Sequence, residues 1–168
     1  HDVTLDLDAT VSSLLINSGN SFTASDGNAR TLTISTDAAA TTLTCNGTWA
    51  NGTGGSTVTF AGLGSHTISG TIGFNDVDIS RPVDFGLNVT INGTLRILAN
   101  GYVNVNAPTY AVGATLQYSS GGTYNRDVEW SQLSGSAYPW HVRVSNSTYL
   151  NLNNYGKNQH RAIRGDLT

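Results

Sequence analysis

Hydrophobic and polar residues alternate in short runs along most of the chain, most clearly between Val89 and Tyr118. Within that stretch a glycine followed shortly by Leu-x-hydrophobic occurs twice, at Gly93–Ile97 and at Gly113–Tyr118. Alternation with a period of two is typical of a β-strand buried on one face, and turns rich in Gly and Asn separate each run from the next. The return of the phrase after about twenty residues predicts that each strand belongs to one coil of a stack.

The same short runs recur from the N-terminus onward, for example at Val3–Leu7, Leu32–Ile34, Leu43–Cys45 and Val58–Phe60. Ser, Thr, Asn and Gly stand where a helical protein carries Lys and Glu, and these residues are poor helix formers. Turn dipeptides such as Asp26-Gly27 supply the positive φ that a tight corner needs. The sequence therefore predicts an all-β protein.

Two architectures fit many short strands: a parallel β-solenoid, built here from coils of roughly 20 residues, and, as the runner-up, an antiparallel β-sandwich. The repeated phrase favours the solenoid, because stacked coils place like residues on like residues and a sandwich has no such requirement. The alternation then predicts one elongated core. The residues expected to point into it are Leu5, Ile16, Leu32, Ile34, Leu43, Val58, Phe60, Ile72, Val77, Ile79, Val89, Ile91, Leu95, Ile97, Leu116, Val142, Val144, Leu150 and Leu152.

Composition narrows the functional classes. The chain has 168 residues, 38% of them hydrophobic and 11% charged, so we expect a single folded module over residues 1–168. A net charge of -3 with dispersed charges argues against nucleic acid as a partner, and no apolar run approaches the roughly 18 residues of a membrane span. Cys45 is the only cysteine, which excludes an internal disulfide, and its place in Leu43-x-Cys45 predicts a buried apolar side chain.

Several segments carry a family resemblance: Leu14–Gly19, Thr57–Phe60 leading to Ser65–Gly70, Ile91–Leu95, and Gly121–Arg126 leading to Glu129-Trp130. They resemble the repeats of very long secreted surface proteins of Bacteroidetes, which look like right-handed parallel β-helices with adhesin-like roles and are commonly exported by the type IX pathway. The resemblance implies a secreted or surface location, no cofactor and no catalytic residues. The chain ends in what reads as the start of another coil, so we expect a piece of a longer repeat array.

The region 118–168 is richer in aromatic residues and less regular. Its aromatic side chains stand among polar ones that include Asn125, Arg126, Glu129, Lys157 and His160. Two interpretations are open: large aromatics that fill a widened coil interior, or a surface that holds sugar rings by their apolar faces. The candidate carbohydrate-binding residues are Tyr124, Trp130, Tyr138 and Trp140, with Tyr149 and Tyr155 close by in sequence.

Other candidate chemistry is weaker. Asp76 and Asp78 share one strand face near Arg81 and Asp84, a pattern that fits a Ca²⁺ site or the carboxylate pair of a polysaccharide-cleaving β-helix. The more ordinary interpretation is a solvated strand face on which an aspartate pairs with Arg81. The histidines His66, His141 and His160 lack the paired spacing of a zinc site, and no Gly-x-Ser-x-Gly nucleophile motif occurs.

Three classes of function follow. The first is a non-catalytic extracellular or cell-surface segment, structural or adhesive, whose partners are neighbouring solenoid repeats of the same polypeptide or filament and surface glycans. The second is a carbohydrate-binding or polysaccharide-degrading β-helix. The third is ice binding, suggested by Thr31-Leu32-Thr33 and Thr42-Leu43-Thr44, and it requires a uniform threonine ladder on successive coils.

Overall fold

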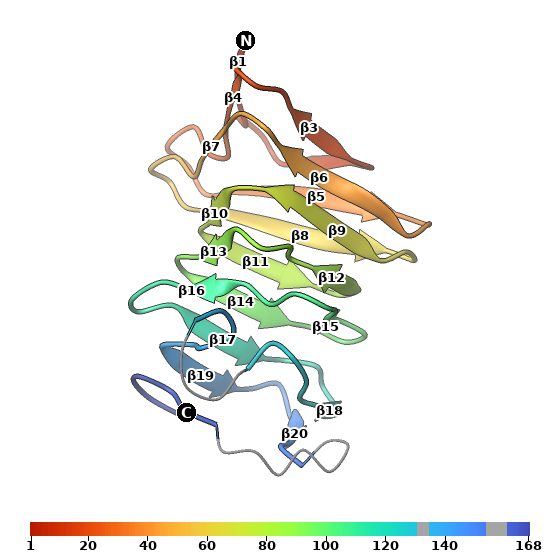
Figure 1. Ribbon diagram of the computed structural model, residues 1–168, viewed down its shortest axis with the longest axis vertical. Helices are drawn as coiled ribbons and strands as arrows, with labels where there is room; N and C mark the ends of the chain where they lie inside the picture. Colours follow the sequence, from red (N-terminus) through yellow and green to blue (C-terminus); the bar gives the residue numbers. More distant parts are fainter. Residues whose placement is uncertain (131–134, 154–160) are drawn as a thin grey trace.

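The strands stack into a β-solenoid of about six turns (Figure 1). This computed structural model describes residues 1–130, 135–153 and 161–168. Every pairing between its named strands is parallel. The prediction of a parallel solenoid is therefore confirmed, and the antiparallel sandwich is excluded.

The longest wall is a seven-stranded sheet in which each strand comes from a different coil. Its members, in chain order, are β2 (Ala9–Val11), β5 (Arg30–Thr36), β8 (Ser56–Gly62), β11 (Asp76–Ile79), β14 (Thr94–Ile97), β17 (Thr115–Tyr118) and β19 (His141–Val144). A second, five-stranded wall runs beside it. It contains β3 (Leu14–Ile16), β6 (Ala40–Cys45), β9 (His66–Gly70), β12 (Pro82–Asp84) and β15 (Tyr102–Val103).

Shorter sheets close the remaining side of the coils. One contains β1 (Asp2–Thr4), β4 (Ser21–Thr23) and β7 (Thr48–Ala50), and the next contains β10 (Ile72–Phe74), β13 (Val89–Ile91) and β16 (Thr109–Tyr110). A two-stranded sheet of β18 (Thr123–Asn125) and β20 (Tyr149–Asn151) lies near the C-terminal end (Figure 1).

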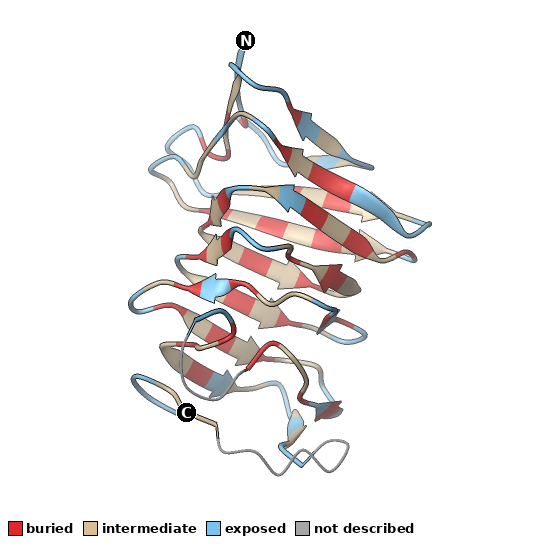
Figure 2. Ribbon diagram, viewed as in Figure 1, coloured by how far each residue is buried: buried red, intermediate tan, exposed pale blue. Residues whose placement is uncertain are grey.

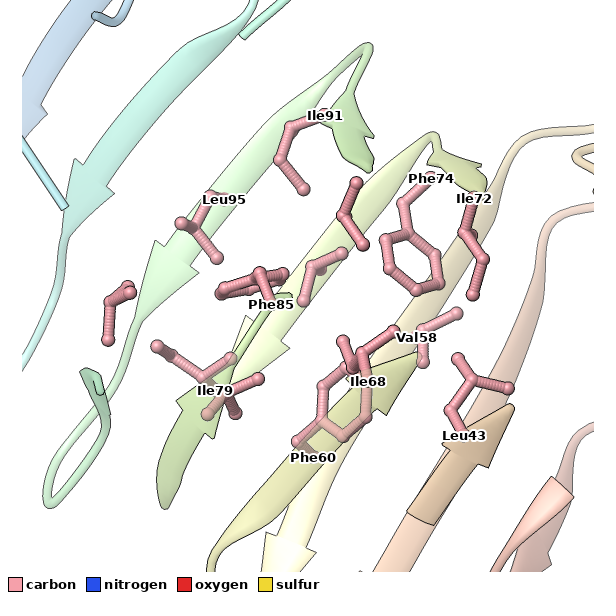
Figure 3. Close-up of a cluster of buried hydrophobic side chains, with 14 of the residues drawn as sticks. Leu43, Val58, Phe60, Ile68, Ile72, Phe74, Ile79, Phe85, Ile91 and Leu95 are labelled. Atoms are coloured by element: carbon pink, nitrogen blue, oxygen red, sulfur yellow. The ribbon is translucent and has the colours of Figure 1, made fainter. Parts of the chain in front are cut away.

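The register stacks apolar residues on one another along the long wall. Leu95 pairs with Val77 on the preceding coil and with Leu116 on the following one, so the two repeats of the Leu-x-hydrophobic phrase are neighbours in space. The side chains of this and the parallel columns form one continuous buried core (Figures 2 and 3). Along this wall the coil length varies, from 18 residues between the paired Asp78 and Arg96 to 26 between the paired Thr33 and Thr59.

Most of the predicted core residues are buried, and three at the C-terminal end are not. Val144 and Leu150 are partly buried, and Leu152 is 48% exposed, so its assignment to the core was wrong. The physical reason is that β20 ends at Asn151, so the alternation that places Leu150 against the core does not extend to Leu152. Cys45 is buried, as predicted.

Close stacking of coils places a constraint on Gly70. Its φ of +100° lies in the left-handed region, and a Cβ at this position would overlap the backbone carbonyl oxygen of Cys45 on the preceding coil. Glycine is therefore required here both by backbone conformation and by the approach of the neighbouring coil.

The two ends of the stack differ. At the N-terminal end an apolar hollow of about 350 Å³ is lined by residues that include Val3, Val11 and Leu15, and Val3 and Leu15 are more than half exposed. At the C-terminal end, the amide of Val142 donates to Asp166 and the amide of Thr168 donates to Val142, at 2.9 and 3.0 Å. The last residues of the chain thus add a further parallel bridge to β19.

Candidate functional site

The four candidate sugar-binding aromatics fall into two pairs. Tyr124 and Trp130 are only 7% and 4% exposed, and the Trp130 indole N–H donates to the carbonyl of Ala162 at 3.0 Å. Their ring faces pack inside the last coils, so they do not form the exposed platform that stacking on a sugar requires. Tyr138 and Trp140 are partly exposed.

Arg164 occupies the surface beside Tyr138 and Trp140. Its guanidinium carbon lies 4.6 Å from the Tyr138 ring centroid and 5.6 Å from that of Trp140, within the range of cation–π attraction. These two rings therefore hold a cationic side chain of the same chain. Carbohydrate binding by Tyr138 and Trp140 stays a prediction, and Tyr155, Lys157 and His160 lie outside the described residues.

Polar groups buried beside Tyr124 and Trp130 form a network centred on Glu129. The Tyr118 hydroxyl donates to Oε1 of Glu129 at 2.9 Å, the Asp127 amide donates to both carboxyl oxygens at 3.0 Å, and the Tyr110 hydroxyl donates to the Glu129 carbonyl at 3.1 Å. Burial raises the pKa of Glu129 to about 7 and raises the pKa of Tyr124. The network lies in the interior of the last coils, beside the rings of Tyr118, Tyr124 and Trp130.

Arg126 belongs to the same interior. Its side chain is fully buried, and it donates to the carbonyls of Asp127 at 3.3 Å and of Leu152 at 3.1 Å. Arg126 and Glu129, which stand among the aromatic residues in the sequence, are thus buried and not exposed on a surface. In the structure they hold the backbone of the last coils together.

The acidic cluster is also arranged differently from the prediction. Asp78 pairs with Arg96 on the next coil at 2.8 Å, and Arg81 instead donates to the carbonyl of Gly62. Burial raises the pKa of Asp78, an effect that the Arg96 charge opposes. Asp76 accepts the Thr94 amide at 2.6 Å. In the described part of the chain, no group of three or more His, Cys, Asp or Glu residues is placed to hold a metal ion.

His66 is a buried, neutral histidine. Its Nε2 lies 2.8 Å from the Ala61 carbonyl, which only accepts, so Nε2 carries the proton and Nδ1 accepts from the Thr42 hydroxyl at 3.0 Å. Burial lowers the pKa of His66 below its ordinary value. Both ring nitrogens are thus used within the core, as in a structural rather than a metal-binding histidine.

Of the threonines predicted as a possible ice-binding face, Thr31 and Thr33 stack in register over a limited length, whereas Thr42 is buried and Thr44 pairs with Leu15 and Ser69. Thr33 pairs with Thr10 and with Thr59. On the next coil Asp78 takes the place of Thr59, and Arg96 follows it. The uniform ladder therefore ends after the third of these strands, and ice binding stays a prediction.

A groove that the sequence did not suggest lies between β15 and β18. It encloses about 810 Å³ and is bordered on one side by Ala99–Tyr102 and on the other by Thr123–Asn125, with Ser120, Gly122 and Asp127 at its margin. Among the described strands, β15 pairs only with β12 and β18 pairs only with β20. The five-stranded wall thus ends at β15, and the groove lies between this strand and β18. Both strands are labelled in Figure 1.

Only the pairing of strands in three dimensions reveals this groove. Asn100 and Tyr102 belong to an unremarkable turn and strand in the sequence, and the alternation pattern gives no sign that the following coil departs from them. The local signal is the exposed Tyr102 two residues after Asn100, whose φ is 66°, and both features are visible only in the structure.

No protein-family model, no curated protein and no solved structure matches this chain. Within the described residues, no helix has the length and apolar character that crossing a membrane requires. The class of protein is therefore defined by the fold alone, a parallel β-solenoid with a groove between β15 and β18.

Proposed function

We propose that this chain is a non-catalytic structural segment of a secreted or surface-exposed protein, a stiff rod that spaces or displays binding regions and takes part in adhesion. The observation that carries the proposal is the unbroken register of the long wall, in which each of seven strands comes from a different coil. A stack in which every coil is hydrogen-bonded to its neighbours and shares one apolar core transmits force along its axis.

The outward residues of the rod support the same role. Along the long wall threonine is the commonest outward residue, charged residues occur at positions such as Asp78 and Arg96, and charged residues make up only 11% of the whole chain. Such a surface is hydrated without a strong electrostatic field, which suits a segment that separates other regions without binding polyelectrolytes.

The open N-terminal end supports the partner that we propose, a further coil of the same polypeptide or filament. The edges of β1, β2 and β3 and the hollow lined by Val3, Val11 and Leu15 offer backbone groups and apolar surface to a coil of the same pattern. A coil that covered this end would remove the side chains of Val3 and Leu15, each more than half exposed, from water.

Surface labelling tests the proposal. Antibodies raised against the isolated chain should label intact cells that produce the protein, or its culture medium, without permeabilisation. A cytoplasmic protein of the same cells, probed in parallel, should stay unlabelled until the cells are permeabilised. Labelling that appears only after permeabilisation would overturn the proposed location and with it the surface role.

A further inference from the structure

The groove between β15 and β18 has walls that are fixed before any ligand arrives. On one side, the Gly101 amide donates to the Leu98 carbonyl at 3.0 Å and closes the turn that carries Asn100. On the other, Thr123 is paired with Tyr149 of β20, and Asn125 accepts from the Asn151 side-chain amide at 2.9 Å. A ligand would therefore lose little affinity to ordering of the site.

The lining combines one aromatic face with uncharged hydrogen-bonding groups. Tyr102 is 45% exposed, and Asn100, Thr123 and Asn125 are exposed around it. In the described part of the chain, no hydrogen bond to the Asn100 amide, the Tyr102 hydroxyl or the Thr123 hydroxyl competes with a ligand. Amides and hydroxyls match the paired donors and acceptors of sugar hydroxyls, and a tyrosine ring packs against the apolar face of a pyranose.

The charge of the lining further restricts the class of ligand that the groove can bind. It contains no Lys, Arg or His, and its one carboxylate residue is Asp127. Such a site has nothing to neutralise a phosphate, a sulfate or an acidic sugar. The volume of about 810 Å³ lies within the range of small-molecule sites, so the groove has room for a short oligosaccharide.

An extended peptide added to the broken wall is the main competing occupant, and the geometry disfavours it. Strand addition needs a run of exposed backbone along an edge. All three residues of the short strand β18 border the groove, but on the opposite side it borders the turn Ala99–Gly101 and only the first residue of β15, and neither Val103 nor Asn104 lines it. The hollow is therefore shaped for a compact ligand at the turn rather than for a strand along the edge.

We propose that this groove binds a neutral oligosaccharide, with the Tyr102 ring packed against a pyranose face and with Asn100, Thr123 and Asn125 hydrogen-bonded to its hydroxyls. The inference rests on the adhesive part of the proposed function, since it names the surface through which the rod attaches. The exposed ring that it uses is that of Tyr102, which the set predicted from sequence did not include; of that set only Tyr124 lines the groove, and Tyr124 is buried.

The test is an NMR titration of the ¹⁵N-labelled chain with neutral hexasaccharides: cello-, manno-, xylo-, malto- and chitohexaose. At least one should shift the amide signals of Ala99–Tyr102 and Thr123–Asn125 and leave those of β5 unchanged. Tyr102→Ala should weaken the association at least tenfold, and Tyr102→Phe, which keeps the ring, should bind nearly as the parent. Leu63→Ala is the control, an exposed apolar residue (75%) outside the groove lining, and should bind unchanged.

Three outcomes overturn the proposal. The first is no shift with any probe at about 10 mM, a concentration at which millimolar affinity is visible. The second is shifts confined to residues outside the groove, and the third is equal loss of binding in Tyr102→Ala and Leu63→Ala. A pool of extended hexapeptides that shifts the groove amides when no saccharide does also overturns it, in favour of a peptide site. Surface labelling is independent of all of these, so a surface protein with an empty groove leaves the rod proposal standing.

Discussion

Replacing Leu95 by alanine tests the register at the middle of the stack. Leu95 is fully buried, and its ladder neighbours Val77 and Leu116 are fully buried as well. The substitution removes three carbon groups, worth about 2.4 kcal/mol at about 0.8 kcal/mol each. The strands on both sides are fixed by backbone pairing, so the space can close only in part.

An unfilled remainder of about 40 Å³, at about 24 cal/mol per Å³, adds about 1 kcal/mol. We therefore expect Leu95→Ala to lower the free energy of unfolding by about 3 to 4 kcal/mol, measured by urea unfolding followed by far-UV circular dichroism. Val112→Ala is the control, because Val112 is 75% exposed in a turn and should lose less than about 0.5 kcal/mol. A loss for Leu95→Ala as small as that of the control would refute the assigned register.

Three further predictions follow from the structure. In the folded chain the pKa of Glu129 is raised from 4.5 to about 7, so the stability contributed by its protonated form is complete below pH 4.5 and is lost as the pH rises through about 7. That contribution is on the order of 3 kcal/mol. Urea unfolding at pH 4.5 and at a pH above 7 should show that Glu129→Gln removes this part of the pH dependence. The same dependence of the free energy of unfolding on pH in parent and variant would contradict the prediction. Gly70→Ala should lower the free energy of unfolding by about 2 kcal/mol or more, because backbone strain adds to the overlap with Cys45. Gly113→Ala, at a φ of +82° with open space around it, should lower it by about 1 kcal/mol in the same assay. Equal losses would argue against close contact between coils at Gly70. The isolated chain should self-associate through its open N-terminal end, as measured by sedimentation velocity. Leu15→Lys should reduce the self-association, while Leu87→Lys, at a residue exposed elsewhere, should leave it unchanged. A strictly monomeric parent chain would show that the end needs no partner.

The sequence was sufficient to predict the solenoid because two separate requirements, burial in the core and stacking on the next coil, act on each inward position. Residues such as Leu95 and Leu116 must be apolar to lie in the core and must match the residue of the next coil, so alternation and repetition agree. Leu152 marks the limit of this reasoning, because alternation alone does not reveal where the last strand ends.

Contacts between coils were harder to predict because they depend on coil length. Asp78 meets Arg96 only because the coil between them has 18 residues, and other coils along the long wall have up to 26. The sequence showed Arg81 near Asp78 along the chain, and proximity along the chain was mistaken for proximity in space.

The candidate site was the least predictable part. Aromatic residues among polar ones are found both in a wide coil interior and on a sugar-binding surface, so composition does not separate the two. Trp130 and Glu129 proved to lie inside. The groove at Tyr102 arises from a pairing that does not form, between β15 and β18, and an unformed pairing leaves no mark in the alternation of either strand.

The central claim is that successive coils stack in register into a rod, and electron–electron distance measurements test it most directly. Spin labels would be placed in pairs at Thr10 and Arg96, Thr10 and Gln117, and Thr10 and Arg143, with the buried Cys45 replaced by alanine. These outward positions are four, five and six steps apart on one ladder. At about 4.8 Å per step the backbone separations should be about 19, 24 and 29 Å, rising by one strand spacing from pair to pair. Distances that do not rise with each added coil would contradict the stacked solenoid and the structural role proposed from it.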